Sequence, residues 1–412
     1  MNKPNSPGPL SGIRVVDLTR VLAGPSATQV LGDLGAEIIK IEKPGAGDDT
    51  RKWGPPYLKD TDGNDTTESA YYLSTNRNKW SVAVDISRSA GQALVTQIAQ
   101  RSHILVENFK TGSLSKYGLS YEILRSAAPR LVYCSITGFG QTGPESHRAG
   151  YDYLAQALSG LMSVTGDPEG PPVKVGIATA DLYTGLYSTI AILAALRHAE
   201  KTGDGQHVDL SLLDSQIAAM SYQAAYYRVS GEVPDRMGNE HPTIVPYSTF
   251  ACSDGEYIAL AVGNDAQFQK VCAFAGRDDL ATDTRFQTND LRVRNRKALM
   301  PLLIKMFIEH PVDHWVKGFD PLGVPCSRVN KLDQVFADPQ VQAREMDLTM
   351  PYPGSDTGTV NLVGSPIKMS RTPVSYRFPP PTLGQQTQQV LNDLLGMKDE
   401  EIDHLRATGV VG

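Results

Sequence analysis

The sequence of 412 residues is poor in cysteine and carries no strong excess of charge of either sign. Its few cysteines lie far apart and form no CxxC pair, which argues against a disulfide framework and favours reduced thiols in a cytoplasmic protein. They are Cys134, Cys252, Cys272 and Cys326. The net charge of -6 argues against a nucleic-acid partner, because such a partner requires a basic surface.

Targeting and membrane signals are also missing from the sequence. The first residues contain no apolar segment of the kind found in secretory signals, and no Arg-rich amphipathic pattern. No apolar run approaches the ~18 residues that a membrane span requires. His310 and His314 have the spacing of a helical metal pair, but Pro311 lies between them and no cysteine or acidic cluster accompanies them. We therefore expect neither a membrane partner nor a metal.

Alternating strand and helix patterns occupy the first half of the chain. Apolar runs that favour strands alternate with helical segments, which predicts an α/β fold with a doubly wound, mostly parallel sheet. These runs cover residues 13–18, 36–42, 81–86, 103–107, 130–136 and 207–212. The character of the sequence changes near residue 230. We predict a large domain from residues 1–225 and 331–412, and a smaller α+β domain from residues 226–330.

Asp181 is the only charged residue between Lys174 and Arg197, and a long apolar run follows it. One interpretation is a helix N-cap, since an aspartate at this position accepts hydrogen bonds from backbone N–H groups. The other is a nucleophile in a pocket that excludes water. This segment alone leaves both interpretations open.

Residues 138–143, with the sequence GFGQTG, match the GxGxxG pattern of dinucleotide-binding loops and follow a predicted strand. The residues after the loop do not form a helical pattern, and the loop comes late in the domain. A nicotinamide or flavin site is therefore the weaker interpretation.

Several ordered blocks together resemble the class III CoA-transferases, the CaiB–BaiF family. They are residues 17–25, 31–42, 45–51, 76–79, 106–109, 137–144 and 179–181, and the resemblance ends at residues 381–385. It implies a Rossmann-like large domain, a smaller middle domain and an interlocked homodimer. It also implies that Asp181 is the catalytic carboxylate, that acyl-CoA is a substrate, and that an aspartyl–acyl anhydride forms on the route.

The same resemblance assigns the remaining site residues. For CoA they are Val21, Leu22, Ala23, Lys43, Val84, Asn108, Phe109, Lys116, Tyr117, Thr137 and Phe139. For the acyl group and the acceptor acid they are Arg77, Arg51, Trp53, Tyr71, Arg148, Tyr151 and His241. Arg77 is the first choice for a distal substrate carboxylate, because a guanidinium binds carboxylates in a bidentate manner.

Three further blocks indicate the class of substrate. They are residues 148–152, 242–247 and 289–296. They resemble the members that exchange CoA between dicarboxylates such as succinyl-CoA and glutarate. Racemases of the same fold carry a Gly-His-Asp motif, but Tyr151 occupies the histidine position here and is a poor proton shuttle at neutral pH. A racemase and a non-catalytic acyl-CoA-binding protein remain as alternatives.

Overall fold

The computed structural model describes residues 8–412. It divides into two compact units, which we describe separately. The larger unit comprises the chain up to residue 161 together with residues 174–229 and 340–412. The second unit comprises residues 162–173 and 230–339. We predict residues 162–173 and 331–339 as parts of the large domain and residues 226–229 as part of the smaller one. The structure places the first two segments in the second unit and the third in the larger unit.

A six-stranded sheet forms the centre of the larger unit, in the order β5-β2-β1-β6-β7-β8, and each neighbouring pair is parallel. The strands are β1 Arg14–Asp17, β2 Glu37–Glu42, β5 Lys79–Ala83, β6 Ile104–Glu107, β7 Val132–Thr137 and β8 His207–Ser211. Counted along the chain, these strands stand in the order 3-2-1-4-5-6, which is that of dinucleotide-binding Rossmann sheets. The predicted parallel α/β sheet is confirmed.

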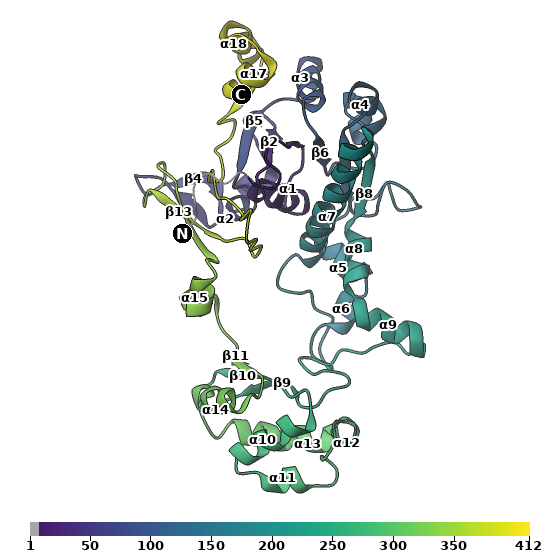
Figure 1. Ribbon diagram of the computed structural model, residues 1–412, viewed down its shortest axis with the longest axis vertical. Coiled ribbons are helices and arrows are strands. Elements are labelled where there is room, and N and C mark those ends of the chain that lie inside the picture. The colour runs from purple at the N-terminus through teal and green to yellow at the C-terminus, as the bar shows by residue number, and fades with distance from the viewer. Residues whose placement is uncertain (1–7) are drawn as a thin grey trace. The chain divides into compact units, whose positions relative to one another are not determined.

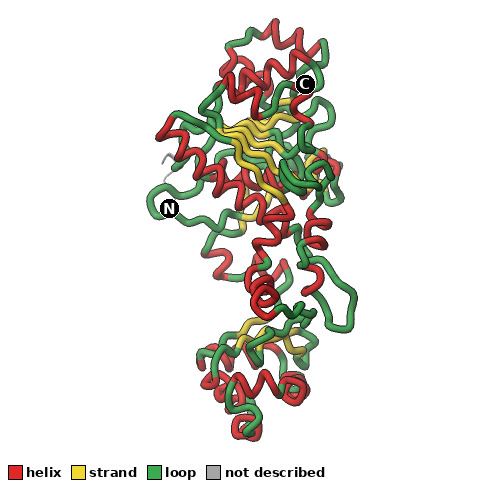
Figure 2. The backbone as a smooth tube through the Cα atoms, turned by 90° about the vertical axis from the view of Figure 1, so that its right-hand side faces the viewer, coloured by secondary structure: helices red, strands yellow, loops and turns green. Residues whose placement is uncertain are grey.

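Helices cover both faces of this sheet, because the strands are apolar on both sides (Figures 1 and 2). One face packs against α3 Ser89–Gln100, α4 Tyr121–Ala127, α17 Thr387–Leu395 and α18 Asp399–Ala407. The other packs against α1 Ala23–Asp33 and α7 Thr179–Thr202. The C-terminal segment thus completes the core that the N-terminal segment begins.

Shorter elements surround the sheet. They are η1 Asp49–Lys52, α2 Ala70–Ser74, η2 Ser113–Tyr117, α5 Asp152–Leu158, α8 Leu212–Ala219, α9 Ser221–Ser230 and α16 Pro339–Ala343, with the strand pairs β3 Tyr57–Lys59/β4 Asp65–Ser69 and β12 Asp347–Pro351/β13 Thr359–Val363. Helix α6 Leu161–Val164 lies where the first unit gives way to the second.

The second unit contains a three-stranded antiparallel sheet in the order β11-β10-β9. Its elements are β9 Tyr247–Ala251, β10 Tyr257–Ala261, α10 Asp265–Phe274, α11 Asp278–Thr282, α12 Asn289–Arg294, α13 Arg296–Phe307, α14 Val312–Phe319, η3 Asp320–Leu322, β11 Cys326–Arg328 and α15 Leu332–Ala337. An aromatic core that includes Trp315, Phe307 and Phe319 holds this sheet against its helices.

Helix α7 differs from the sequence prediction in one respect. By length and composition alone its 24 residues are sufficient to cross a membrane, although we predict no such segment from the sequence. This is weak support for a span, because a core helix meets the same criterion. One face of α7 is buried against α1 and the sheet through residues that include Ile192 and Leu196.

Candidate active site

The candidate site lies where the order of the sheet reverses, between β1 and β6. Ligands of open parallel sheets bind in the crevice beyond the carboxyl ends of the strands at this point. A cavity of about 520 Å³ opens there, a size typical of small-molecule sites. Residues from several separate segments of the larger unit line it, among them Arg20, Val21, Leu22, Ala23, Trp53, Asn108, Phe109, Thr137, Gly138, Arg148, Tyr151, Asp152 and Asp181.

A second cavity of about 390 Å³ shares Arg20, Asp49 and Phe109 with the first. Its walls come from the ends of β1, β2 and β5 and from η2, and include the predicted CoA residues Lys43, Val84, Phe109 and Tyr117. The guanidinium of Arg20 lies 5.3 Å from the centre of the Phe109 ring. Two cavities that share a cationic and aromatic wall can together accommodate an extended anionic ligand.

Asp181 lines the first cavity from the first turn of α7, but it is not the N-cap. The N-cap residue is Ala178, and Asp181 is the third residue of the helix. The carboxylate of Asp152 provides the cap instead, since its Oδ1 accepts the N–H groups of Ala180 at 2.8 Å and Asp181 at 3.3 Å. The N-cap interpretation of Asp181 is therefore wrong, and its own carboxylate is not used for capping.

Burial and a neighbouring negative charge both raise the pKa of the Asp181 carboxyl. Burial is the larger cause and the negative charge of Asp152 the second, and together they raise the pKa of Asp181 from 3.8 to about 7. The same surroundings raise the pKa of Tyr71 to about 12, chiefly through burial and then through the charges of Asp181 and Asp152. A poorly hydrated carboxylate of this kind is a stronger nucleophile than one in water.

The chain that leads into α7 is held by a buried glutamine. Gln156, on the helix that Asp152 begins, accepts the N–H of Val175 at 2.9 Å and donates to the carbonyl of Ile177 at 3.2 Å. Its amide also donates to Oδ2 of Asp152 at 2.7 Å. Helix α5 thus fixes both the approach to α7 and its first turn, so the position of Asp181 is set by a rigid neighbour.

The structure brings most of the predicted residues together. Val21, Leu22, Ala23, Asn108, Phe109, Thr137, Trp53, Arg148 and Tyr151 line the cavity of Asp181. The ring of Tyr71 lies against that of Trp53, with centroids 5.2 Å apart. Phe139 lies under the guanidinium of Arg148, 4.9 Å away, and Nζ of Lys116 lies 4.6 Å from the centre of the Tyr117 ring.

Two predicted arginines are engaged elsewhere. Arg77 is 4% exposed and binds the carboxylate of Asp33 through Nε and Nη2, while its Nη1 donates to a backbone carbonyl. Arg51 is 3% exposed and lies between Glu42 and Glu68. Neither lines the cavity of Asp181, because both complete buried ion pairs. Arg148 and Arg20 are the arginines that do line it.

Two other predictions concern the GFGQTG loop and His241. In the GFGQTG loop, the N–H of Gly140 donates to Oγ1 of Thr137 and that of Gln141 to the carboxylate of Asp209. These two backbone N–H groups are therefore not offered to a ligand. His241 belongs to the second unit, where its Nδ1 accepts the N–H of Thr243 at 3.2 Å.

Sequence reasoning missed the roles of Asp152 and Gln156. Asp152 is visible in the sequence as part of the Gly-Tyr-Asp block, and the glutamine follows it by one helical turn. That spacing indicates that the two side chains can meet. It does not indicate that they cap a helix that begins 27 residues later, since such a contact depends on how the sheet brings the two helices together.

Comparison with known proteins identifies the family of the chain. The family model described as CoA-transferase family III matches residues 10–387. The chain is 46% identical to the succinate–glutarate CoA-transferase of Agrobacterium fabrum, over 95% of this chain and 97% of the relative, and 45% identical to the human succinyl-CoA:glutarate CoA-transferase, over 99% and 91%. The crystal structure of a CaiB/BaiF family protein from Brucella suis superposes with a TM-score of 0.85 at 43% identity, covering 94% of this chain and 100% of the other. The chain belongs to CoA-transferase family III.

Proposed function

We propose that the protein transfers CoA from succinyl-CoA to a dicarboxylic acid such as glutarate, with Asp181 as the nucleophile. The observation that carries this proposal is the Asp181 carboxylate, which lines a cavity at the sheet's switch point and is not occupied in capping its helix. The similarity to succinate–glutarate CoA-transferases supports the choice of donor and acceptor.

The proposed reaction conserves the thioester through four substitutions at carbonyl carbon. The Asp181 carboxylate attacks the succinyl-CoA carbonyl, which forms a mixed anhydride and releases CoA thiolate. The thiolate attacks the aspartyl carbonyl, which releases succinate and leaves an aspartyl-CoA thioester. Glutarate then attacks this thioester to give a new anhydride and thiolate. Attack of the thiolate on the glutaryl carbonyl gives glutaryl-CoA and regenerates Asp181.

Each intermediate is susceptible to hydrolysis, so the surroundings of the carboxylate must limit access of water. The raised pKa of Asp181 is a consequence of the same burial. The paired aromatic rings of Trp53 and Tyr71 provide an apolar wall. A distal substrate carboxylate needs a cation, and Arg148 is our candidate because it lines this cavity and its ion pair with Glu145 is exposed rather than buried.

The nucleophile is tested by trapping. Wild-type protein is incubated with succinyl-CoA and hydroxylamine, digested and analysed by mass spectrometry. We expect a hydroxamate on the peptide that contains Asp181, and we expect Asp181→Asn to lose both this product and CoA transfer to glutarate. A modified peptide elsewhere, or transfer retained by Asp181→Asn, would refute the assignment. A parallel screen with glutarate, malate, itaconate, mesaconate, citramalate and oxalate identifies the acceptor.

The distal cation is tested by comparing two acceptors. Arg148→Met removes the guanidinium but retains much of the side-chain length. We expect the KM for glutarate to rise about tenfold or more, since hydrogen bonds to charged groups contribute ~1.5–3 kcal/mol. The KM for a monocarboxylate such as butyrate should stay within about twofold. Equal changes for both acids would exclude Arg148 as the specific partner.

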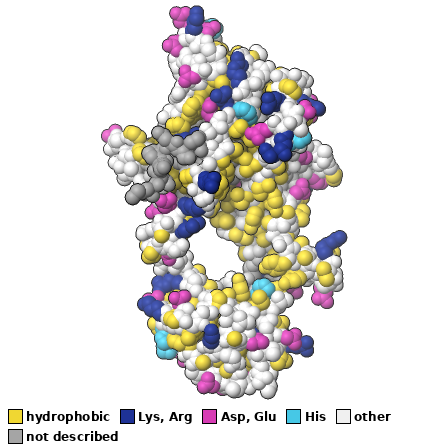
Figure 3. Space-filling view, in the orientation of Figure 1, with side chains coloured by type: hydrophobic (Ala, Val, Ile, Leu, Met, Phe, Trp, Pro, Cys, Tyr) yellow, Lys and Arg dark blue, Asp and Glu magenta, His cyan; other side chains and the backbone are white. Residues whose placement is uncertain are grey.

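We also propose that two copies of the chain associate through an apolar surface of the larger unit. Hydrophobic side chains gather over α5, α7 and their neighbours (Figure 3). On α5 and α7 alone they include Tyr153, Leu154, Leu158, Tyr183, Leu186, Tyr187 and Ile190, of which Ile190 is 63% exposed. Contiguous apolar surfaces of this kind mark interaction sites. The family's interlocked homodimer would cover this surface.

Light scattering after size exclusion tests the association. Wild-type protein should elute with the mass of a dimer, and Ile190→Glu should shift it toward the monomer. The matched control is Ile123→Glu, because Ile123 is 47% exposed on α4, away from this surface. A monomeric wild type, or equal effects of both substitutions, would contradict the proposal.

A further inference from the structure

The turn that follows β1 is held by side chains at every polar backbone group from the Thr19 N–H to the Val21 N–H. The Thr19 N–H donates to Asp17, and the Thr19 carbonyl accepts Nζ of Lys40 at 2.8 Å. The amide of Asn108 accepts the Arg20 N–H at 2.9 Å and donates to the Arg20 carbonyl at 2.7 Å. The Val21 N–H donates to Asp48 at 3.2 Å.

Val21 adopts a backbone conformation that valine normally avoids. Its φ angle is 73°, in the left-handed region, where a β-branched side chain is an outlier. Such a conformation persists only where the surroundings enforce it, and it is found mostly at functional sites. Val21 lines the cavity of Asp181. The residues that enforce its conformation therefore shape one wall of that cavity.

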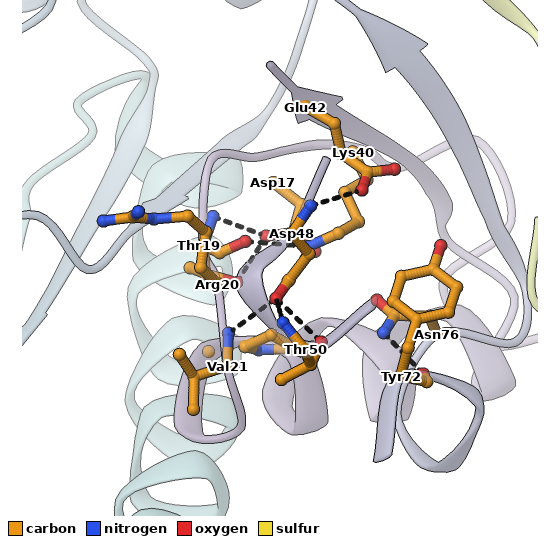
Figure 4. A network of polar contacts seen from close by, with 12 residues as sticks. Asp17, Thr19, Arg20, Val21, Lys40, Glu42, Asp48, Thr50, Tyr72 and Asn76 are labelled. Atoms are coloured by element: carbon orange, nitrogen blue, oxygen red, sulfur yellow. Dashed lines mark hydrogen bonds and ion pairs between the residues drawn. The ribbon is translucent and has the colours of Figure 1, made fainter. Parts of the chain in front are cut away.

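The buried pair of Lys40 and Asp48 provides two of these restraints. Both side chains are fully buried and lie 2.9 Å apart. Asp48 directs one carboxylate oxygen toward Val21 and toward the N–H and hydroxyl of Thr50, while the other accepts Lys40 (Figure 4). Lys40 lines neither cavity, so it cannot act by touching a ligand there, whereas Asp48 also lines the second cavity.

We propose that Lys40 and Asp48 are positioning residues, which hold the turn of Thr19, Arg20 and Val21 in the strained conformation that transfer requires. This inference rests on the proposed function. A buried ion pair does not by itself imply stability, since apolar replacements of similar volume are often neutral. Its retention here is explained by its two bonds to backbone groups of a cavity wall, Thr19 O and Val21 N.

The test uses three variants: Val21→Gly, a Lys40/Asp48 double variant and a control. A fourth, combined variant joins Val21→Gly with the Lys40/Asp48 double variant. Val21→Gly removes the strain and also the restraint, because glycine adopts φ of 73° and many other values freely. Lys40→Met combined with Asp48→Ala removes the charge pair and both bonds to the turn without leaving one charge buried alone. Glu345→Gly is the matched control, since Glu345 also has a positive φ, of 54°, but lies on the surface outside both cavities.

We expect Val21→Gly and the Lys40/Asp48 double variant each to lower kcat about tenfold or more, because small misplacements at a reacting centre are costly. The KM for glutarate, which neither Val21 nor Asp48 is assigned to bind, should stay within about threefold, which separates misplacement from loss of fold. The combined variant should be no more than about twofold slower than the slower of the two, since both changes release the same turn. Glu345→Gly should retain wild-type kcat.

Wild-type kcat in Val21→Gly, or effects that multiply in the combined variant, would overturn the proposal. If wild-type protein shows no transfer at all, the proposed function fails and hydrogen exchange decides this inference instead. The amides of Arg20 and Val21 should be protected in wild type and lose protection in the Lys40/Asp48 variant but not in Glu345→Gly. Unchanged protection would refute the positioning role.

Discussion

Replacement of the proposed nucleophile should stabilise the protein, and more so at high pH. The pKa of Asp181 is raised from 3.8 to about 7 in the folded state. Between these values the folded state binds the proton more tightly than the unfolded state, so this group lowers stability as the pH rises. Proton linkage lowers the free energy of unfolding by about 2 kcal/mol at pH 5 and by about 4 kcal/mol at pH 8, relative to a side chain that stays neutral. Asp181→Asn abolishes this penalty and retains the size of the side chain.

Urea unfolding followed by tryptophan fluorescence measures the effect. In a Trp315→Phe background, Trp53 and Trp80 report on the larger unit alone. The stability advantage of Asp181→Asn over its parent should grow by about 2–3 kcal/mol between pH 5 and pH 8. The control is Asp60→Asn, because hydrogen bonds from the backbone lower the pKa of this exposed carboxyl and its replacement should not become favourable with rising pH.

The refuting result is clear. If Asp181→Asn raised the free energy of unfolding by the same amount at pH 5 and at pH 8, the surroundings would not disfavour the ionised form of Asp181. If the substitution were destabilising at pH 8, Asp181 would be making favourable interactions as an anion, which is the behaviour of a structural cap. A stabilised but inactive variant is instead what is expected where a site sacrifices stability for function.

Three further results are expected. Asp152→Asn retains an acceptor for the first turn of α7 but removes a negative charge, so the rising limb of the pH–rate profile should move to lower pH; an unmoved limb would show that burial alone sets the pKa of Asp181. Arg51→Met leaves the carboxylates of Glu42 and Glu68 without their partner and should destabilise the protein by ~3–5 kcal/mol in urea unfolding; wild-type stability with a raised acceptor KM would restore Arg51 to the site. Lys43→Ala should weaken the binding of CoA, measured by calorimetry, about fivefold or more and leave the KM for glutarate unchanged; unaltered CoA affinity would remove Lys43 from the CoA site.

The sheet was predictable from the sequence because its strands are buried on both faces. Such strands appear as nearly continuous apolar runs, and helical segments separate them. The Val-rich β1 and the Ile-rich β2 are examples, and they pair in parallel in the register Val16↔Ile39. Strand order could not be predicted in this way. It depends on which faces the crossover helices cover, which is a property of the whole sheet.

The roles of charged residues were less predictable. Arg77 and Arg51 both belong to blocks that resemble the family, yet both are buried in ion pairs with carboxylates 44 and 9 residues away in the sequence. A charged residue in a family block is consistent with a ligand contact and equally with a fold-defining pair. Only the position of its partner decides between them, and the partner is set by tertiary structure.

Asp181 and Asp152 show how two carboxylates near one helix end acquire different properties. The N-terminus of a helix stabilises an anion, which would lower the pKa of an aspartate placed there. Asp152 takes that place, because its Oδ1 accepts the N–H groups of Ala180 and Asp181. Asp181 is therefore left with its burial and, second, with the negative charge of Asp152, and its pKa rises to about 7. Capping by a distant residue thus leaves the Asp181 carboxylate available for the nucleophilic role that we propose, with a pKa near neutrality.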